Sequence, residues 1–186
     1  MKRKESLFTA LSLVIITVVA VSCARPAVKN MIPPLYSLDL ISTDKTVKVA
    51  DVKGGRKPQF GGMETIDNET FKEALINTLE QARLFKEITT DKKADYELYV
   101  EIITQNMKTR ASLAYTVLLY INYTLVKTDS NEEIWQRKIK SRYEATVEEA
   151  FSGATRMVRA LEGSVKDNLS QLLQRLSKLP HLSDKK

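Results

Sequence analysis

Two stretches of the chain carry apolar residues at the spacing of an amphipathic helix. The first helix is predicted over residues 68–84, with Asp67 or Asn68 as its N-cap. Its apolar positions are Phe71, Leu75, Leu79 and Ala82. The second helix is predicted over residues 149–178 and ends before Pro180. Its apolar stripe consists of Met157, Leu161, Val165, Leu169, Leu172 and Leu176.

Four other stretches alternate between apolar and polar positions, which is typical of strands with one buried face. They cover residues 46–53, 95–102, 113–125 and 134–143. The stretch 113–125 is the candidate central strand, because both of its faces are apolar enough to be buried. The polar residues 106–110 and 129–132 predict turns. Arg137 and Ser141 fall on the same side of 134–143 as Trp135, which predicts an edge strand or a bulge.

The order of these elements predicts an α+β fold, a two-layer sandwich. The first strand reaches the next one through a helix, which predicts a parallel crossover, and the last three strands predict an antiparallel meander. We expect a mixed sheet of about four strands with both helices on one face. The domain is predicted over residues 45–179 and is followed by a disordered tail over 180–186.

Residues 1–22 predict a lipoprotein signal peptide rather than part of the fold. Three basic residues precede an uncharged apolar run over 7–21, which is shorter than the roughly 20 residues of a membrane-spanning helix. The run ends at Ala20-Val21-Ser22-Cys23, which resembles the bacterial lipobox. This resemblance implies cleavage before Cys23, a diacylglycerol thioether on its sulfur, and an N-acyl chain such as palmitate on the new terminus.

Cys23 is therefore the predicted lipidation site and membrane anchor. Ala24 follows it where an aspartate would favour the inner membrane, so resemblance to enteric sorting rules implies a periplasm-facing position on the outer membrane. Residues 23–44 contain three prolines and predict a tether that lets the domain stand off the membrane. The alternative is an uncleaved anchor that carries a free thiol at Cys23.

The amino-acid composition limits which binding and catalytic sites the chain can form. The 186 residues are 43% hydrophobic and 28% charged, which is typical of a globular protein, and the net charge of +6 is too small to predict nucleic-acid binding. One Cys and one His exclude a disulfide framework or a multi-cysteine metal centre and leave little to build a His-based site. The glycine-bearing residues 54–62 lack a phosphate-loop signature. We predict no catalytic residue, no metal and no cofactor except the acyl chains on Cys23.

An envelope hydrolase is the enzymatic alternative. Glu97 and Glu101 lie on one face of a predicted strand, and paired carboxylates can act as acid and base when the pKa of one is raised. Four residues along a strand span about 13 Å, however, which exceeds the separation of carboxylate pairs in glycoside hydrolases. We therefore interpret both glutamates as solvated surface charges.

Five short stretches of the chain form a combination that resembles a known group of proteins. The stretches are Asp51-Val52-Lys53-Gly54-Gly55, Phe71-Lys72-Glu73-Ala74-Leu75, Ala94-Asp95-Tyr96-Glu97-Leu98, Glu132-Glu133-Ile134-Trp135 and residues 160–169. Together they resemble a group of uncharacterised proteobacterial envelope lipoproteins that have no assigned activity. The element order also resembles the lipopolysaccharide-assembly lipoprotein that plugs the outer-membrane translocon, and the lipoprotein activator of penicillin-binding proteins, whose fold is like the TolB N-terminal domain. The resemblance implies an accessory role in envelope assembly or transport.

Two sets of residues are candidates for binding. If the helices cover the side of Leu98, Val117 and Trp135, the open side would present apolar and aromatic residues to a protein partner. These are Tyr99, Leu118, Tyr120, Val126 and Ile134. The second set, Lys138, Lys140 and Arg142, projects to one side and could bind the phosphates of a glycolipid. The alternatives are an open side covered by residues 54–65 or by the tether, and a basic row that only protects an edge strand.

Overall fold

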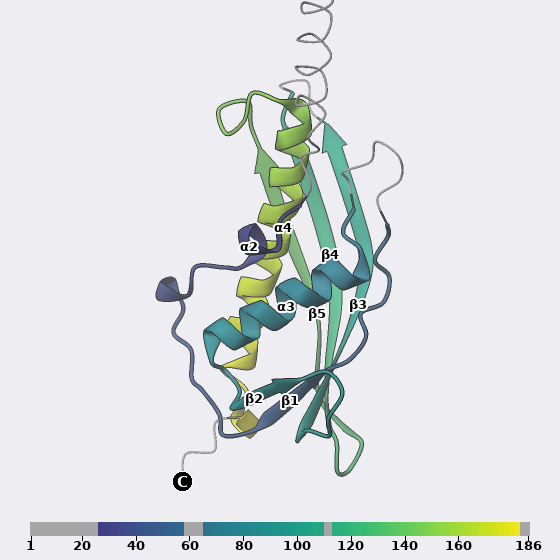
Figure 1. Ribbon diagram of the computed structural model, residues 1–186, viewed down its shortest axis with the longest axis vertical. Helices are drawn as coiled ribbons and strands as arrows, with labels where there is room; N and C mark the ends of the chain where they lie inside the picture. The colour runs from purple at the N-terminus through teal and green to yellow at the C-terminus, as the bar shows by residue number, and fades with distance from the viewer. Residues whose placement is uncertain (1–25, 58–64, 110–112, 183–186) are drawn as a thin grey trace, which may run out of the picture.

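A mixed sheet forms one layer of the protein, and two helices on the same face of this sheet form the other layer (Figure 1). The computed structural model describes residues 26–57, 65–109 and 113–182. The sheet has five strands in the order β2-β1-β3-β4-β5. The prediction of an α+β sandwich is therefore confirmed, with one strand more than expected.

The parallel part of the sheet is short and is built around the first strand. β1 (Thr46–Val49) pairs in parallel with both β2 (Glu87–Thr89) and β3 (Tyr96–Thr109). Helix α3 (Asn68–Ala82) connects β1 to β2. β2 is the strand that the sequence did not predict, since three residues are too few to display an alternation. After β1 ends at Val49, backbone hydrogen bonds still join the chain to β3, from the Ala50 amide to the Leu98 carbonyl and at an isolated bridge between Lys53 and Glu101.

The antiparallel part consists of three long strands joined as a meander. β3 pairs with β4 (Tyr115–Lys127), and β4 pairs with β5 (Glu132–Ala145). The prediction of a turn at residues 106–110 is wrong, because strand β3 continues to Thr109. Up to Ile102 the even-numbered residues of β3 face the core. A bulge between Ile102 and Thr104 shifts this alternation by one position, so that Met107 packs on the core beyond the bulge.

Helix α4 (Gly153–Leu176) covers β4 and β5 and supplies most of the second layer. Its predicted stripe is confirmed except at Met157, which is only partly buried, since Leu161, Val165, Leu169, Leu172 and Leu176 are all fully buried. The helix begins later than the sequence predicted, because Ser152 still has extended backbone and serves as the N-cap residue. The buried stripe is matched across the interface by the apolar positions of β4: Val117, Leu119, Ile121, Tyr123 and Leu125.

A small polar network lies inside this apolar interface. Tyr123 donates a hydrogen bond of 2.8 Å to Oδ1 of Asn168. Asn168 Nδ2 in turn donates to the Ile139 carbonyl at 3.2 Å and to Ser141 Oγ at 3.0 Å. Ser141 also shares a hydrogen bond of 3.2 Å with Ser164. Burial raises the pKa of Tyr123 well above its usual range, so the hydroxyl keeps the proton that it donates.

Part of the predicted tether is packed on the domain instead of standing free. Residues Val28–Met31 form a one-turn helix, α2, and Met31 is fully buried. The Ala27 amide donates to Oε1 of Glu162 at 2.7 Å, and Asn30 Nδ2 donates to both carboxylate oxygens at 3.0 Å. The chain continues through a single 3₁₀ turn, η1 (Leu35–Ser37), before it reaches β1. The prolines did not reveal this docking, which depends on Glu162 far along the sequence.

The predicted disordered tail also begins inside the folded domain. Pro180–Leu182 form a second 3₁₀ turn, η2, and Leu182 is buried in the core. The rest of that predicted tail, residues 183–186, lies outside the described residues, as do the signal peptide and Cys23.

We expect Asn168→Ala to lower the free energy of unfolding by about 2–4 kcal/mol, because it leaves the Tyr123 hydroxyl and the Ile139 carbonyl buried without their partner. Chemical denaturation monitored by circular dichroism measures this change. Lys166→Ala, on the same helix but partly exposed, is the control and should stay within about 0.5 kcal/mol of the wild type. Equal stabilities of the two variants would show that the network does not stabilise the fold.

Candidate functional site

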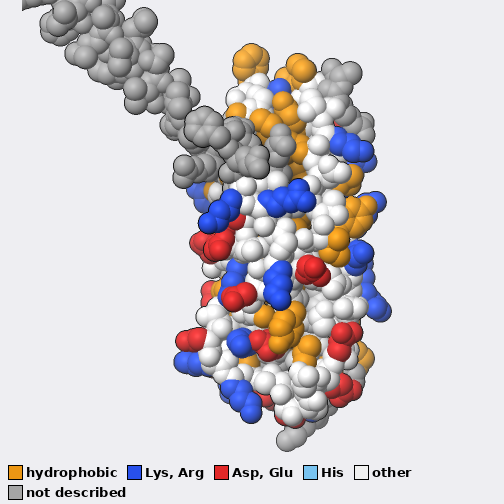
Figure 2. Space-filling model, turned by 90° about the vertical axis from the view of Figure 1, so that its right-hand side faces the viewer, with side chains coloured by type: hydrophobic (Ala, Val, Ile, Leu, Met, Phe, Trp, Pro, Cys, Tyr) orange, Lys and Arg blue, Asp and Glu red, His pale blue; other side chains and the backbone are white. Residues whose placement is uncertain are grey.

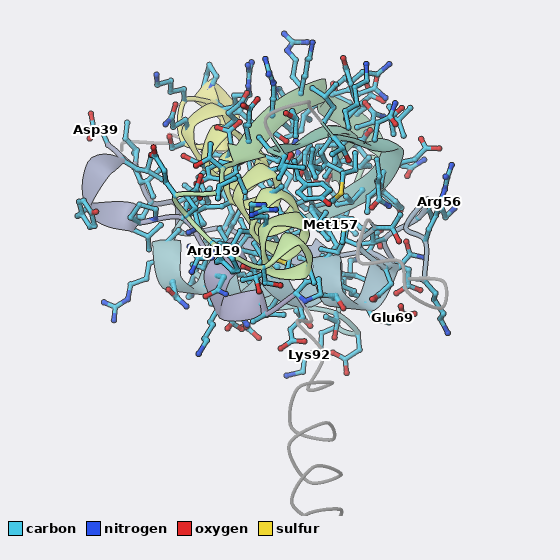
Figure 3. All side chains as sticks on the ribbon, turned by 90° about the horizontal axis from the view of Figure 1, so that it is seen from above. Asp39, Arg56, Glu69, Lys92, Met157 and Arg159 are labelled. Atoms are coloured by element: carbon cyan, nitrogen blue, oxygen red, sulfur yellow. The ribbon has the colours of Figure 1, made fainter. Side chains whose placement is uncertain are left out.

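The face of the sheet that points away from α3 and α4 is the candidate binding surface. On the side that faces the helices, Leu98 and Val117 are fully buried and Trp135 is partly buried against the hydrophobic core, so the opposite side is the open one. On the opposite side, nitrogen-bearing side chains project away from α4 (Figure 3). Along the side of the molecule next to β3, charged and hydrophobic side chains are intermixed (Figure 2). On the open face itself, the strand register places apolar residues of β4 opposite basic residues of β5, a mixture suited to binding.

The two predicted binding sets meet on the open face between β4 and β5. The strand register places Tyr120 opposite Lys140, Leu118 opposite Arg142, and Asn122 opposite Lys138. The Lys140 ammonium lies 5.4 Å from the centroid of the Tyr120 ring, within the range of a cation–π contact. The hydrophobic pair and the basic row therefore form one surface. We call these five residues, Leu118, Tyr120, Lys138, Lys140 and Arg142, the β4–β5 patch.

The edge of this patch is held by polar contacts. Arg142 forms an ion pair with Glu144 at 3.2 Å. Glu144 also accepts a hydrogen bond of 2.9 Å from Thr116 on the neighbouring strand. Both contacts fix the end of the basic row nearest the loop between β5 and α4. Lys138 and Lys140 remain exposed on the face itself.

Two residues that the sequence grouped with this patch lie elsewhere. Tyr99 pairs with Thr124, four positions along β4 from Tyr120, which corresponds to about 13 Å. Ile134 lies at a bulge where the register between β4 and β5 shifts, and it packs against the hydrophobic core. The alternation of apolar and polar residues does not reveal an inserted residue, so the sequence analysis placed Ile134 on the open side instead of against the core.

Tyr99 instead belongs to a second group of polar residues near β1. Its hydroxyl donates to Oε2 of Glu97 at 2.7 Å, and Lys48 Nζ lies 2.8 Å from Oε1 of the same carboxylate. The hydrogen bond from Lys48 lowers the pKa of Glu97, and the hydrogen bond to Glu97 raises the pKa of Tyr99. Two shallow depressions of about 240 and 290 Å³ adjoin Tyr99.

Sequence reasoning missed the part of this group that comes from β1 and the residues after it. Both depressions are lined by Asp51 and Lys53, and Asp51 forms an ion pair with Lys72 of α3 at 2.8 Å. One residue of this group could have been found from the sequence. Lys48 lies between Val47 and Val49, which are buried, so the alternation of a strand places Lys48 on the open side. Nothing in the sequence alone indicated that β1 lies next to Glu97.

The chemistry of this second group suits binding better than acid–base catalysis. A general acid near neutral pH needs a carboxyl with a raised pKa, whereas the pKa of Glu97 is lowered. The described residues contain no group of three or more His, Cys, Asp or Glu side chains that could hold a metal ion. Within the same residues, every helix is too short or too polar to cross a lipid bilayer.

Neither a protein-family model nor a curated protein matches the sequence. Solved structures do share the fold. A Xanthomonas campestris protein of the family DUF330 superimposes with a TM-score of 0.61 at 11% identity, over 81% of this chain and 92% of its own. PelC from Paraburkholderia phytofirmans, crystallised as a dodecamer, gives a TM-score of 0.52 at 12% identity, over 76% of this chain and 95% of its own. At these identities the likeness extends to the fold alone.

We expect Tyr99 to titrate above its ordinary pKa of about 10, and Glu97→Gln to move this titration back down, since the neutral amide no longer stabilises the protonated phenol as strongly. NMR of ring-labelled tyrosine against pH measures the change. Glu101→Gln, two residues further along the same side, is the control and should leave Tyr99 unchanged. An unaltered titration in Glu97→Gln would contradict the contact.

Proposed function

We propose that this chain is a lipid-anchored, non-enzymatic binding module of the bacterial envelope. In this proposal Cys23 holds it to the periplasmic side of the outer membrane, and the β4–β5 patch binds an envelope protein. The observation that carries the proposal is the composition of the patch on a face that the described helices leave open. Tyrosine and arginine side chains, both present in the patch, are enriched at protein interfaces.

The electrostatics of the patch favour a partner with acidic groups. Lys138 and Lys140 are exposed and lie two positions apart, so both ammonium groups face the same side of the strand. A carboxylate of the partner could pair with either of them while an apolar side chain rests on Tyr120 and Leu118. Such charge complementarity orients the two proteins and raises the rate at which they meet.

The fold is compatible with a binding role but does not identify what is bound. The Xanthomonas and Paraburkholderia structures show that this sandwich occurs in other bacterial proteins, but a fold does not establish an activity. The lipobox resemblance is the reason to locate the module in the envelope, and the resemblance to lipopolysaccharide-assembly and penicillin-binding-protein activator lipoproteins makes an assembly or transport complex the natural setting.

We expect Tyr120→Asp to abolish co-purification of the envelope partner while leaving the fold intact, because it places a negative charge at the centre of the patch. The partner is first captured in living cells by a photo-crosslinking amino acid at position 120 and identified by mass spectrometry. Co-purification of this identified protein is then compared between wild type and variant.

Tyr36→Asp is the matched control, since Tyr36 is an exposed tyrosine in η1, away from the sheet. It should retain the partner, and a crosslinker at position 36 should give no adduct with it. Retention of the partner by Tyr120→Asp would remove the patch as the binding site.

The alternative function is the handling of lipopolysaccharide, with the basic row bound to lipid A phosphates. The observation that favours it is the regular spacing of Lys138, Lys140 and Arg142 on an edge strand. Under this alternative the crosslinker at position 120 captures glycolipid. The adduct is lost when the three residues are changed to glutamate.

The control for this reversal changes Lys86, Lys92 and Lys93 to glutamate. These three lysines are exposed and lie at the β1–β2 end of the sheet, so the net charge changes equally at a different place. Loss of glycolipid in both triple variants would indicate a general charge effect and exclude a specific site.

We expect labelled palmitate to enter the wild-type protein and to be absent from Cys23→Ala, since the thiol is the predicted acceptor. Metabolic labelling followed by immunoprecipitation measures incorporation, and mass spectrometry of the wild type identifies its N-terminus. A wild-type chain with a free thiol and an intact leader would contradict the lipid anchor.

A further inference from the structure

Three exposed hydrophobic side chains lie at one end of the molecule. Leu113 precedes β4 by two residues and Val147 follows β5 by two residues, and the last pair of that ladder is Tyr115 with Ala145. Both side chains therefore lie beyond the same end of the sheet. Phe151, in the loop between β5 and α4, is 93% exposed. We call Leu113, Val147 and Phe151 the apolar tip.

The loop that carries Phe151 returns to the same end. It leads into Gly153, whose missing Cβ would lie 3.5 Å from the Tyr115 hydroxyl at the start of β4. In Figure 1 this loop and the start of α4 occupy the upper end of the molecule. Hydrophobic side chains project from this upper end in Figure 2. The three exposed residues thus lie at the same end of the molecule.

Polar contacts hold the backbone of this loop. The buried Arg156 donates to the carbonyls of Ala150 and Phe151, both at 2.9 Å, and its guanidinium lies 5.8 Å from the Tyr115 ring. Glu149 accepts hydrogen bonds from the Tyr143 hydroxyl at 2.9 Å and from the Thr146 amide at 3.3 Å. The Ala150 and Phe151 carbonyls and the Glu149 carboxylate are thus hydrogen-bonded within the protein, although the buried Nε of Arg156 has no partner among the described residues, and the Phe151 ring is exposed. This combination suits entry into a lipid surface, where unpaired backbone groups are costly.

The predicted anchor lies nearer to the tip than to the opposite end of α4. Glu162 fixes Ala27 beside α4, and the four residues back to Cys23 span at most about 14 Å. Along α4, the distance from Glu162 to its start at Gly153 is about 13.5 Å, whereas its end at Leu176 is about 21 Å away. A membrane that holds Cys23 is therefore within closer reach of the apolar tip than of the end at Leu176.

We propose that the apolar tip inserts into the lipid surface in which Cys23 is anchored. Leu113, Val147 and Phe151 then form a second membrane contact that orients the domain with its long strands rising from the membrane. This orientation rests on the lipid anchor of the proposed function, but it does not depend on the partner at the β4–β5 patch. In this orientation the patch stays accessible along the side of the molecule.

Depth-dependent fluorescence quenching tests the insertion. The acylated full-length protein is purified from membranes and placed in phosphatidylethanolamine–phosphatidylglycerol vesicles. Trp135→Phe first removes the single native tryptophan, and Phe151→Trp then places one at the tip. We expect a blue-shifted emission that brominated lipids quench. Tyr36→Trp in the same background is the control, because Tyr36 is also 93% exposed, and we expect neither effect there.

Each result decides the proposal. No quenching at position 151, or equal quenching at 151 and 36, would overturn it. A blue shift that occurs in native membranes but not in protein-free vesicles would also overturn it and would indicate a protein partner at the tip.

A second variant separates the tip from the anchor. With Val147→Asp and Phe151→Asp the protein should stay in the membrane fraction through its acyl chains, while the loop between β5 and α4 becomes accessible to added protease. Unchanged protection of this loop would count against insertion. Release of the wild-type chain from the membrane fraction would count against the lipid anchor. In that case the fluorescence result alone would decide whether the apolar tip inserts into lipid.

Discussion

The packing of α4 on β4 and β5 is the interaction on which the rest of the structure depends. The apolar stripe of the helix packs on the buried face of β4 and on part of β5, and the hydrogen bonds of Asn168 with Tyr123 and Ser141 fix how the helix lies against these strands. Since these buried polar groups are paired in this arrangement, any sliding of the helix would leave them without partners. One consequence is that the opposite face of β4 and β5 remains available for binding.

The same helix also holds the segment that precedes the sheet. Glu162 projects from α4 and holds Ala27 and Asn30, so the segment after the predicted lipidation site is docked instead of extended. If Cys23 is lipidated as proposed, this docking would keep the domain close to the lipid, whereas a long tether would let it stand off. The proposed lipid contact of Phe151, in the loop before α4, depends on this docking, which the residue's position in the sequence did not suggest.

The binding surface could be predicted in part. The alternation of β4 and β5 correctly placed Leu118, Tyr120 and the basic row on the side away from the helices, because the strands are regular over that stretch. The prediction failed for Ile134, where a bulge inserts a residue, and it could not see that Tyr99 lies far from Tyr120. The contact of Lys48 with Glu97 depends on the pairing of strands separated by a helix, which no local pattern encodes.

The sequence by itself determined the α+β class, the two amphipathic helices, the antiparallel meander and the burial of the helical stripe, because periods of 3.6 and 2 residues follow directly from backbone geometry. Only the tertiary structure decided the fifth strand, the bulges in β3 and β5, the docking of α2 on Glu162 and the gathering of Leu113, Val147 and Phe151 at one end. Each of these depends on contacts between segments distant in the chain, and such contacts leave no periodic signal in the residues that make them.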